Sequence, residues 1–150
     1  MIIAVIDGMG GGIGAQIVTQ LRAELPLDVE IWALGSNAVA TQRMMQARAT
    51  RGASGENAIR VSIGQADYII APIGAVVPNA MMGEITTGIA EAVAGAPGHK
   101  FFLPIAQHHF EIVGIDWKPL TKQIAAAISA IRQLQFGEAP EGKEHRDVSR

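Results

Sequence analysis

The chain opens with a continuous apolar stretch, followed by glycines and then by apolar positions at helical spacing. Residues 2–6 are rich in β-branched side chains and are stopped by Asp7 and Gly8, a pattern typical of a parallel strand buried on both faces. Beyond the glycines, isoleucine, valine and leucine recur at helical spacing until Pro26. The first 25 residues therefore predict a strand, a glycine-rich turn and a helix, which together open a Rossmann-like domain.

The same alternation continues along the chain. Further strands are expected at residues 29–34, 66–73, 101–105 and 111–115, and helices at residues 37–47, 78–94 and 120–134. In the last helix the positions expected to be buried are Leu120, Ile124, Ala127, Ile128, Ile131 and Leu134. Strands that alternate with helices predict an α/β fold: a Rossmann-like, doubly wound and mainly parallel sheet of about five strands in a three-layer α/β/α arrangement.

A glycine-rich segment separates the second helix from the next expected strand. Gly52 and Gly55 predict a loop, and residues 56–63 fit either a short helix or a strand. Glu56 or Asn57 would face a bound ligand if this loop closes over one. An ordinary capped turn is the alternative.

The expected helix at residues 78–94 is interrupted by Gly83 and Gly88. Each glycine costs about 1 kcal/mol relative to alanine in a helix. Two short helices that meet near residues 84–87 therefore fit the pattern equally well.

Composition and charge narrow the class of protein. The chain has 150 residues, 49% of them hydrophobic and 17% charged, with a net charge of −2 and no cysteine. The lack of a basic run argues against nucleic-acid binding, and the absence of cysteine excludes disulfides and thiolate metal ligands. No apolar stretch approaches the ~18 residues of a membrane span, and the amino terminus does not resemble a signal peptide. We therefore expect one soluble, cytoplasmic domain at residues 1–136 and a disordered polar tail at residues 137–150.

The glycine-rich turn is the strongest candidate binding site. It comprises Gly8, Met9, Gly10, Gly11, Gly12, Ile13 and Gly14. Gly10-x-Gly12-x-x-Ala15 matches the dinucleotide fingerprint. The spacing of Gly8, Gly12 and Gly14 resembles the cofactor turn of short-chain dehydrogenases, although that family usually carries threonine where this chain has Asp7.

Glycines let a ligand approach the backbone closely, and the N–H groups at a helix start attract anions. The turn therefore predicts binding of a nucleotide-like small molecule, NAD(P) or a related phosphate-bearing ligand. A tight turn that binds nothing is the alternative.

Three absences limit what this turn does. No Lys-Ser or Lys-Thr follows the glycines, which excludes the phosphate loop of the NTPases. The second strand ends in Gly35, Ser36 and Asn37 rather than in the acid that binds the ribose hydroxyls of NAD. Ser36 with Arg43 would instead fit a 2′-phosphate, which slightly favours NADP. Tyr68 has no lysine four residues later, so the acid–base pair of the short-chain dehydrogenases is missing.

The carboxyl ends of parallel strands share one edge of the sheet, where α/β folds bind their ligands. Ser36, Asn37 and Gly74 follow expected strands and are expected to line this crevice beside the turn. A domain of this size leaves little room for a separate substrate domain. A sensor or a small oxidoreductase subunit is therefore favoured over a complete enzyme, and a non-catalytic structural subunit is a further alternative.

A small metal- or phosphate-dependent enzyme is the second hypothesis. Its candidate catalytic residues are Asp7, Glu84, His108 and His109. On an extended strand His109 and Glu111 share a face and are candidate metal ligands, but zinc usually takes three or four protein ligands, so we do not expect a metal. Asp7 has three candidate roles: to cap the glycine turn, to bind a ribose hydroxyl, or to hold a metal that bridges phosphate.

Two methionine pairs, Met44-Met45 and Met81-Met82, lie in expected helices. Adjacent residues of a helix do not share one face, so one member of each pair is expected at the surface, as at a subunit interface. We therefore expect a homo-oligomer, in the first instance a dimer.

Five motifs together suggest a family. They are IDGMGGGIG (6–14), LGSNAVAT (34–41), GASGENAI (52–59), PIGAVVPNAMMGEIT (72–86) and EIVGI (111–115). This combination resembles a family of small bacterial proteins known as domain of unknown function 3842. The resemblance implies a Rossmann-type fold and carries no particular activity with it.

Overall fold

Five parallel strands form one sheet at the centre of the protein. In the computed structural model, which describes residues 1–105 and 110–137, the strands are β1 (Ile2–Asp7), β2 (Glu30–Gly35), β3 (Arg51–Ser54), β4 (Tyr68–Pro72) and β5 (His99–Leu103). Their order across the sheet is β3-β2-β1-β4-β5, and every neighbouring pair is parallel. This is the order of a doubly wound fold that starts in the middle of the sheet and grows outward in both directions.

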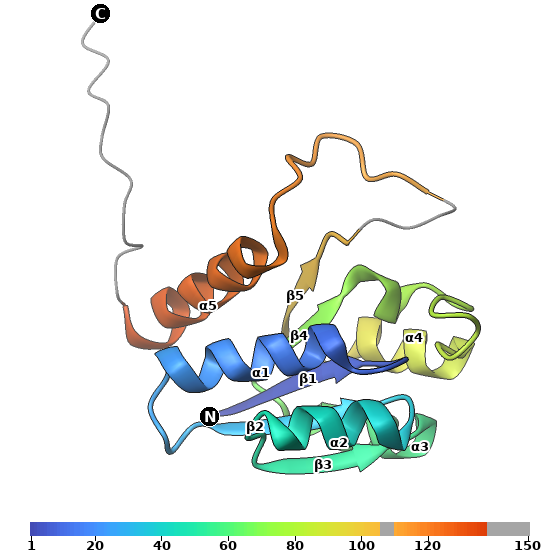
Figure 1. The fold of residues 1–150 in the computed structure, drawn as a ribbon, viewed down its shortest axis with the longest axis horizontal. Coiled ribbons are helices and arrows are strands. Elements are labelled where there is room, and N and C mark those ends of the chain that lie inside the picture. Colours follow the sequence, from blue (N-terminus) through green and yellow to red (C-terminus); the bar gives the residue numbers. More distant parts are fainter. Residues whose placement is uncertain (106–109, 138–150) are drawn as a thin grey trace, which may run out of the picture.

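Helices cover both faces of the sheet, so the fold has the predicted three layers (Figure 1). One face carries α1 (Gly12–Glu24), α2 (Ala38–Gln46) and α5 (Leu120–Phe136). The other carries α3 (Glu56–Ser62) and α4 (Thr87–Gly95), together with the short 3-10 turns η1 (Ile63–Gln65) and η2 (Ile73–Val76). The α/β, Rossmann-like, doubly wound fold class is therefore confirmed.

The central strand β1 is buried on both faces, as its continuous apolar run predicts. Ile3 and Val5 point into the core beneath α1 and α5, whereas Ala4 and Ile6 point into the core beneath α3 and α4. All four side chains have no exposed surface. Because successive side chains of a strand point to opposite faces, this one strand supplies both hydrophobic cores.

The direction of growth reverses between β1 and β4, which pair directly. In such folds the crevice at the carboxyl ends of the two strands is the usual ligand site. Here the glycine turn follows β1, and a long loop from Ile73 to Thr86 follows β4. These two connections therefore flank the position where the fold binds ligands.

The fifth strand of the sheet is not the one that the sequence predicts. Residues 51–54 form the edge strand β3 where a loop was expected, and residues 111–115 form no strand but an exposed segment with a turn at Val113 and Gly114. Hydrogen bonds hold β3 in place instead of apolar burial: Thr50 N–H donates to Ile31 O over 2.7 Å, and the hydroxyl of Ser54 donates to that of Thr41 over 2.7 Å. Because β3 has no periodic pattern of apolar residues, hydrophobic periodicity does not predict it.

The prediction of a helix at residues 78–94 is also wrong for the first half of that range. Residues 78–84 form successive turns, and α4 begins only at Thr87. The hydroxyl of Thr86 accepts from Ile89 N–H over 3.1 Å and caps this helix, as a threonine at the N-cap position does. Met81 and Met82 consequently lie in turns, but Met82 is 91% exposed and Met81 partly buried. On α2, Met44 is buried and Met45 is 37% exposed, so one member of each pair is at the surface as predicted.

The predictions for the carboxyl-terminal part of the chain are confirmed only in part. Of the predicted tail at residues 137–150, Gly137 is the C-cap of α5, and residues 138–150 lie outside the described residues. On α5 the expected face is buried at Ile124, Ala127, Ile128 and Ile131, but Leu134 is 57% exposed because it lies beyond the part of the helix that packs on the sheet. Within the described ranges, the search for a helix long and apolar enough to cross a membrane found none.

We predict that α5 is held mainly by its central turns. Ile128→Ala should lower the free energy of unfolding by about 2–5 kcal/mol, because it removes a fully buried side chain and leaves a cavity. Leu134→Ala on the same helix should change it by no more than about 0.5 kcal/mol. Urea unfolding followed by circular dichroism measures both variants, and equal effects would contradict this placement of α5.

Candidate functional site

Asp7 caps the glycine turn. Its carboxylate is 3% exposed and accepts two backbone hydrogen bonds, from Gly8 N–H over 2.8 Å and from Gly14 N–H over 2.7 Å. Gly14 is the third residue of α1, and its N–H is one of those that a helix start leaves without a helical partner. Of the three roles considered for Asp7, the structure shows the cap.

The environment of Asp7 raises the pKa of its carboxyl above the ordinary 3.8. Burial is the largest cause, because it disfavours the charged form. The hydrogen bonds from Gly14 and Gly8 oppose it, the charge of Glu84 raises the pKa further, and the charge of Arg43 lowers it. The charges of Glu84 and Arg43 therefore both influence the pKa of Asp7.

Two glycines of the turn are required by the fold itself. Gly11 has a φ of +73°, and a Cβ there would lie 2.7 Å from Ala40 Cα, so α2 packs directly on the backbone of the turn. A Cβ on Gly14 would lie 2.9 Å from Asp7 Cβ, so a side chain there would displace the buried cap. Close packing explains these two positions without a ligand.

Gly10 and Gly12 are different, because nothing in the fold requires glycine there. A Cβ on Gly12 would have the guanidinium of Arg43 as its nearest contact, at 3.5 Å, and a Cβ on Gly10 would lie 3.8 Å from the same group. Neither residue has a positive φ. The backbone at these positions is therefore open to close approach by another molecule.

The open part of the turn also carries spare hydrogen-bond donors. The N–H groups of Gly10, Gly12 and Ile13 donate to no acceptor within the described part of the chain. Arg43 extends from α2 over the turn, and its Nη1 donates to Gly10 O over 3.3 Å. Backbone N–H groups at a helix start, together with a guanidinium, form a suitable environment for a phosphate.

Glu84 reaches this turn from the β4–α4 loop. Its carboxylate accepts from Met9 N–H, over 3.2 Å to Oε1 and 3.1 Å to Oε2, and from the hydroxyl of Ser36 over 2.8 Å. The side chain of Asn37 donates to Oε1 as well. Glu84 therefore joins the end of β2 to the turn after β1, although it is distant from both in the sequence.

These bonds keep Glu84 ionised. Burial raises the pKa of its carboxyl, but the hydrogen bonds from Asn37, Ser36 and Met9 outweigh this effect, so that the pKa lies below the ordinary 4.5. Asn37 is itself fixed, because its Oδ1 accepts from Ala40 N–H over 2.8 Å as the predicted cap of α2 and its Nδ2 donates to Met9 O over 2.9 Å. The carboxylate is thus held by partners that are rigidly placed.

The structure thus brings the turn, Ser36, Asn37 and Glu84 together. The hydroxyl of Ser36 donates to Glu84 and the guanidinium of Arg43 donates to Gly10 O, so each member of the pair expected to bind a 2′-phosphate has a partner within the protein. Sequence reasoning placed Glu84 only in the hypothesis of a small metal- or phosphate-dependent enzyme. Nothing in the sequence signals its contact with Ser36, which is 48 residues away.

The remaining candidates lie elsewhere. Gly74 is buried in η2, directly after β4. Glu56 bonds the hydroxyl of Thr86 at the start of α4 and does not face the glycine turn. Glu111 is exposed, and His108 and His109 lie outside the described residues. No group of three or more His, Asp or Glu side chains able to hold a metal was found among residues 1–105 and 110–137.

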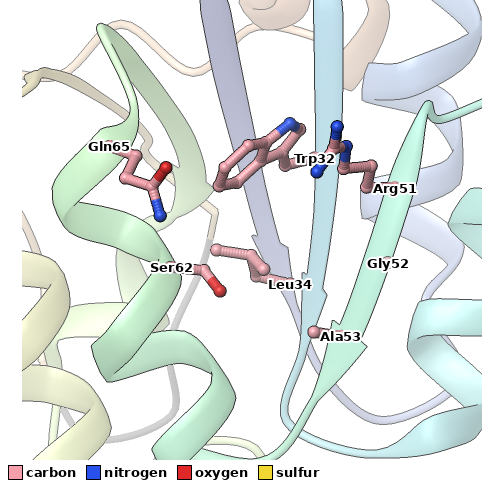
Figure 2. Close-up of a pocket in the computed structure, with 7 residues that line it drawn as sticks. All are labelled: Trp32, Leu34, Arg51, Gly52, Ala53, Ser62 and Gln65. Atoms are coloured by element: carbon pink, nitrogen blue, oxygen red, sulfur yellow. The ribbon is translucent and has the colours of Figure 1, made fainter.

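Sequence reasoning did not anticipate a cavity of about 280 Å³ on the α3 face of the sheet (Figure 2). Trp32 and Leu34 from β2 form one wall, and Ser62 and Gln65 point toward them from the opposite side. The guanidinium of Arg51 lies 5.8 Å from the centre of the Trp32 ring. This cavity borders the carboxyl end of α3 and not the glycine turn, so it is separate from the candidate site.

A second hollow of about 510 Å³ lies between β5 and the start of α5 and includes Lys100, Lys118 and Lys122 in its lining. Neither hollow contains a residue of the glycine turn.

The comparison with known proteins places the chain in a family. The profile described as "Domain of unknown function (DUF3842)" matches residues 2–135. The chain belongs to this family. The resemblance seen in its motifs is therefore confirmed, and no curated protein sequence matches the chain.

Two solved structures match the chain at low similarity. One is the apo histidine-tagged saccharopine dehydrogenase (L-Glu forming) from Saccharomyces cerevisiae, with 12% identity and a TM-score of 0.41 over 85% of this chain and 25% of that one. The family member thus spans about a quarter of the yeast enzyme. The other is a dodecameric FMN-dependent UbiX-like decarboxylase from Escherichia coli O157:H7, with 15% identity and a TM-score of 0.39 over 95% of this chain and 98% of that one.

We predict that Glu84 makes the stability of the fold depend on pH in the acid range. Because the folded pKa lies below the ordinary 4.5, the contribution of Glu84 is complete above that pH and is lost as the pH falls through the folded value. Glu84→Gln should therefore lower the free energy of unfolding clearly at about pH 6.5 and much less at about pH 3, as measured by urea unfolding.

The raised pKa of Asp7 gives the opposite slope above pH 3.8. Its largest cause, burial, is present in both proteins and cancels in the difference, whereas the smaller part that comes from the charge of Glu84 is lost in the variant. Glu91→Gln, at an exposed glutamate of α4, is the matched control and should show no such pH dependence. A wild-type-to-variant difference that is constant between these two pH values would contradict the role given to Glu84.

Proposed function

We propose that this family member binds a nucleotide, NAD(P) or a related phosphate-bearing ligand, at the turn from Gly8 to Gly14. The observation that supports the proposal is that backbone N–H groups without an acceptor and open space for a ligand occur together at this turn. The N–H groups of Gly10, Gly12 and Ile13 have no acceptor within the described ranges, and only the flexible Arg43 stands over them. A phosphate placed there would accept from the backbone and pair with the guanidinium.

The position of the turn in the fold supports a nucleotide over a bare phosphate. The turn lies beside the point where the strand order reverses, between β1 and β4, which is where open α/β sheets bind extended ligands. Gly74 follows β4 at the same edge, so a ligand anchored at the turn would extend toward it. Ser36 and Asn37 would border the ligand on the β2 side.

The role that we propose is that of a sensor or a small oxidoreductase subunit. An anion site with a charged guanidinium and rigid backbone donors is suited to recognition, and it supplies no acid–base pair of the short-chain dehydrogenase type. Cofactor binding is accordingly the first property to measure.

We predict that Gly12→Asp weakens ligand binding without unfolding the protein. Gly12 is the first residue of α1, where a carboxylate is favourable for the helix, and the nearest contact of a new Cβ is the movable Arg43. The new carboxylate would occupy the anion site and repel phosphate. Isothermal titration with NADH, NADPH, ADP and FMN should show binding by the wild type and at least about tenfold weaker binding by the variant.

Gly64→Asp is the matched control, because a Cβ on Gly64 meets nothing within 4 Å and this exposed position lies in η1. It should bind as the wild type does. No binding of any of these nucleotides by the wild type, or unchanged binding by Gly12→Asp, would reject the proposal.

We also propose that the chain forms a homo-oligomer, a dimer in the first instance. The segment 110–119 runs outside the three layers of the fold (Figure 1) and carries apolar side chains in water: Val113 is 96% exposed and Trp117 51% exposed. Phe110 and Ile115 of the same segment are also partly exposed, and exposed apolar side chains gathered in one short segment are typical of an interface.

We predict that Val113→Glu shifts the protein to monomers, because it places a charge in that surface. Light scattering coupled to size-exclusion chromatography measures the mass. Leu27→Glu changes a residue that is 79% exposed between α1 and β2 and should leave the mass unchanged. A wild type that is already monomeric would contradict the proposal.

A further inference from the structure

The end of β2 lacks the carboxylate that nucleotide-binding α/β folds use to recognise ribose, and Glu84 supplies one from elsewhere. In those folds an acid at the end of the second strand binds the ribose hydroxyls. Here β2 ends in Gly35 and continues with Ser36 and Asn37. The carboxylate of Glu84 bonds both of these polar side chains and so lies at the position that the missing acid would serve.

We infer that Glu84 is the ribose-recognising residue of the site and that it selects a nucleotide with a free 2′-hydroxyl over its 2′-phosphorylated counterpart. The inference rests on the nucleotide binding proposed above and adds the ligand class to it. It also reverses the slight preference for NADP that Ser36 and Arg43 suggest in the sequence.

The hydrogen bonds of Glu84 leave it able to accept more. Oε1 takes the donors of Ser36 and Asn37 and part of the Met9 N–H, whereas Oε2 shares only the Met9 N–H, over 3.1 Å. A carboxylate oxygen accepts about two hydrogen bonds. Glu84 is also partly exposed, so Oε2 remains accessible to a hydroxyl from a ligand.

Charge along the turn matches the two parts of a nucleotide. Glu84 bonds the N–H of Met9, and Arg43 bonds the carbonyl of the next residue, Gly10. A negative group and a positive group therefore stand side by side over consecutive residues. The phosphate belongs next to Arg43 and the spare N–H groups, and the hydroxyl-bearing ribose next to Glu84.

The backbone that delivers Glu84 is unusual. Met81, Met82 and Gly83 have φ angles of 56°, 55° and 89°, so three successive residues before Glu84 lie in the left-handed region. Two of them carry side chains for which this region is unfavourable. The loop is held in this form by backbone bonds, among them Asn79 N–H to Ile85 O over 2.7 Å, and the result is a fixed carboxylate at the end of β2.

A 2′-phosphate would meet this carboxylate directly. Two like charges brought together at a binding site cost several kcal/mol. A 2′-hydroxyl would instead donate to Oε2, and a carboxylate makes such a bond stronger than a neutral acceptor does. The same side chain therefore favours one ligand and opposes the other.

The test uses two pairs of ligands that differ at one position of the ribose. NADH and NADPH differ by the 2′-phosphate, and ADP and 2′-deoxy-ADP differ by the 2′-hydroxyl. Titration calorimetry on the full chain should show at least about tenfold tighter binding of NADH than of NADPH, and tighter binding of ADP than of its deoxy form. Glu84→Gln should reduce the NADH-to-NADPH preference to within about threefold, because it removes the charge and keeps the shape.

Two further variants keep the outcomes separate. Glu91→Gln on α4 should leave both preferences intact, and Arg43→Ala should weaken NADH and ADP alike without changing the ADP-to-deoxy-ADP ratio. Circular dichroism and the thermal midpoint establish that each variant is folded.

A wild type that prefers NADPH or shows no preference overturns the inference while the proposed function stands, and so does an unchanged preference in folded Glu84→Gln. A wild type that binds FMN but none of these four ligands overturns the inference alone. A wild type that binds neither FMN nor any of the four rejects the proposed function and the inference with it.

Discussion

The carboxylate of Asp7 joins the end of the central strand to the start of the first helix from inside the protein. Its two oxygens take the N–H groups of Gly8 and Gly14. Burial of a carboxylate is costly unless its oxygens accept hydrogen bonds, and the start of a helix has N–H groups that need acceptors. The buried carboxylate of Asp7 and the N–H groups of the turn therefore satisfy one another. This cap fixes the path of the turn and hence the direction in which its remaining N–H groups point.

The glycines of the turn divide between two tasks. Gly11 and Gly14 allow α2 and the buried Asp7 to pack against the backbone. Gly10 and Gly12 meet only the end of a flexible arginine, and the fold would accept a side chain at either position. A glycine-rich sequence therefore does not by itself say which residues serve packing and which leave room for a ligand. The distances to neighbouring atoms separate the two.

Charged groups around the turn come from three different connections of the fold. Arg43 belongs to α2, Glu84 to the loop after β4, and Asp7 to the end of β1. They meet because the carboxyl ends of parallel strands lie at one edge of the sheet. Asn37 links two of these parts, since it caps α2 and bonds both Met9 and Glu84. The candidate site is thus a product of the sheet order rather than of any single motif.

The sequence by itself determined the elements whose cause is local. The apolar run of β1, the glycine turn and the periodic face of α1 follow from neighbours in the chain, and the alternation of strands and helices predicted the three-layer fold. The sequence left three roles open for Asp7, of which the structure shows the cap. It could not reveal β3, whose four residues are held by hydrogen bonds to Thr41 and Ile31 and show no apolar pattern. Residues 111–115 are rich in β-branched residues and yet pair with no strand of the sheet, because pairing depends on a neighbouring strand and not on the sequence pattern alone. Only the tertiary structure showed that Glu84 lies at the end of β2. Its contact with Ser36 across 48 residues arises from the order of the strands and the path of a strained loop. Neither of these causes produces a periodic signal in the sequence.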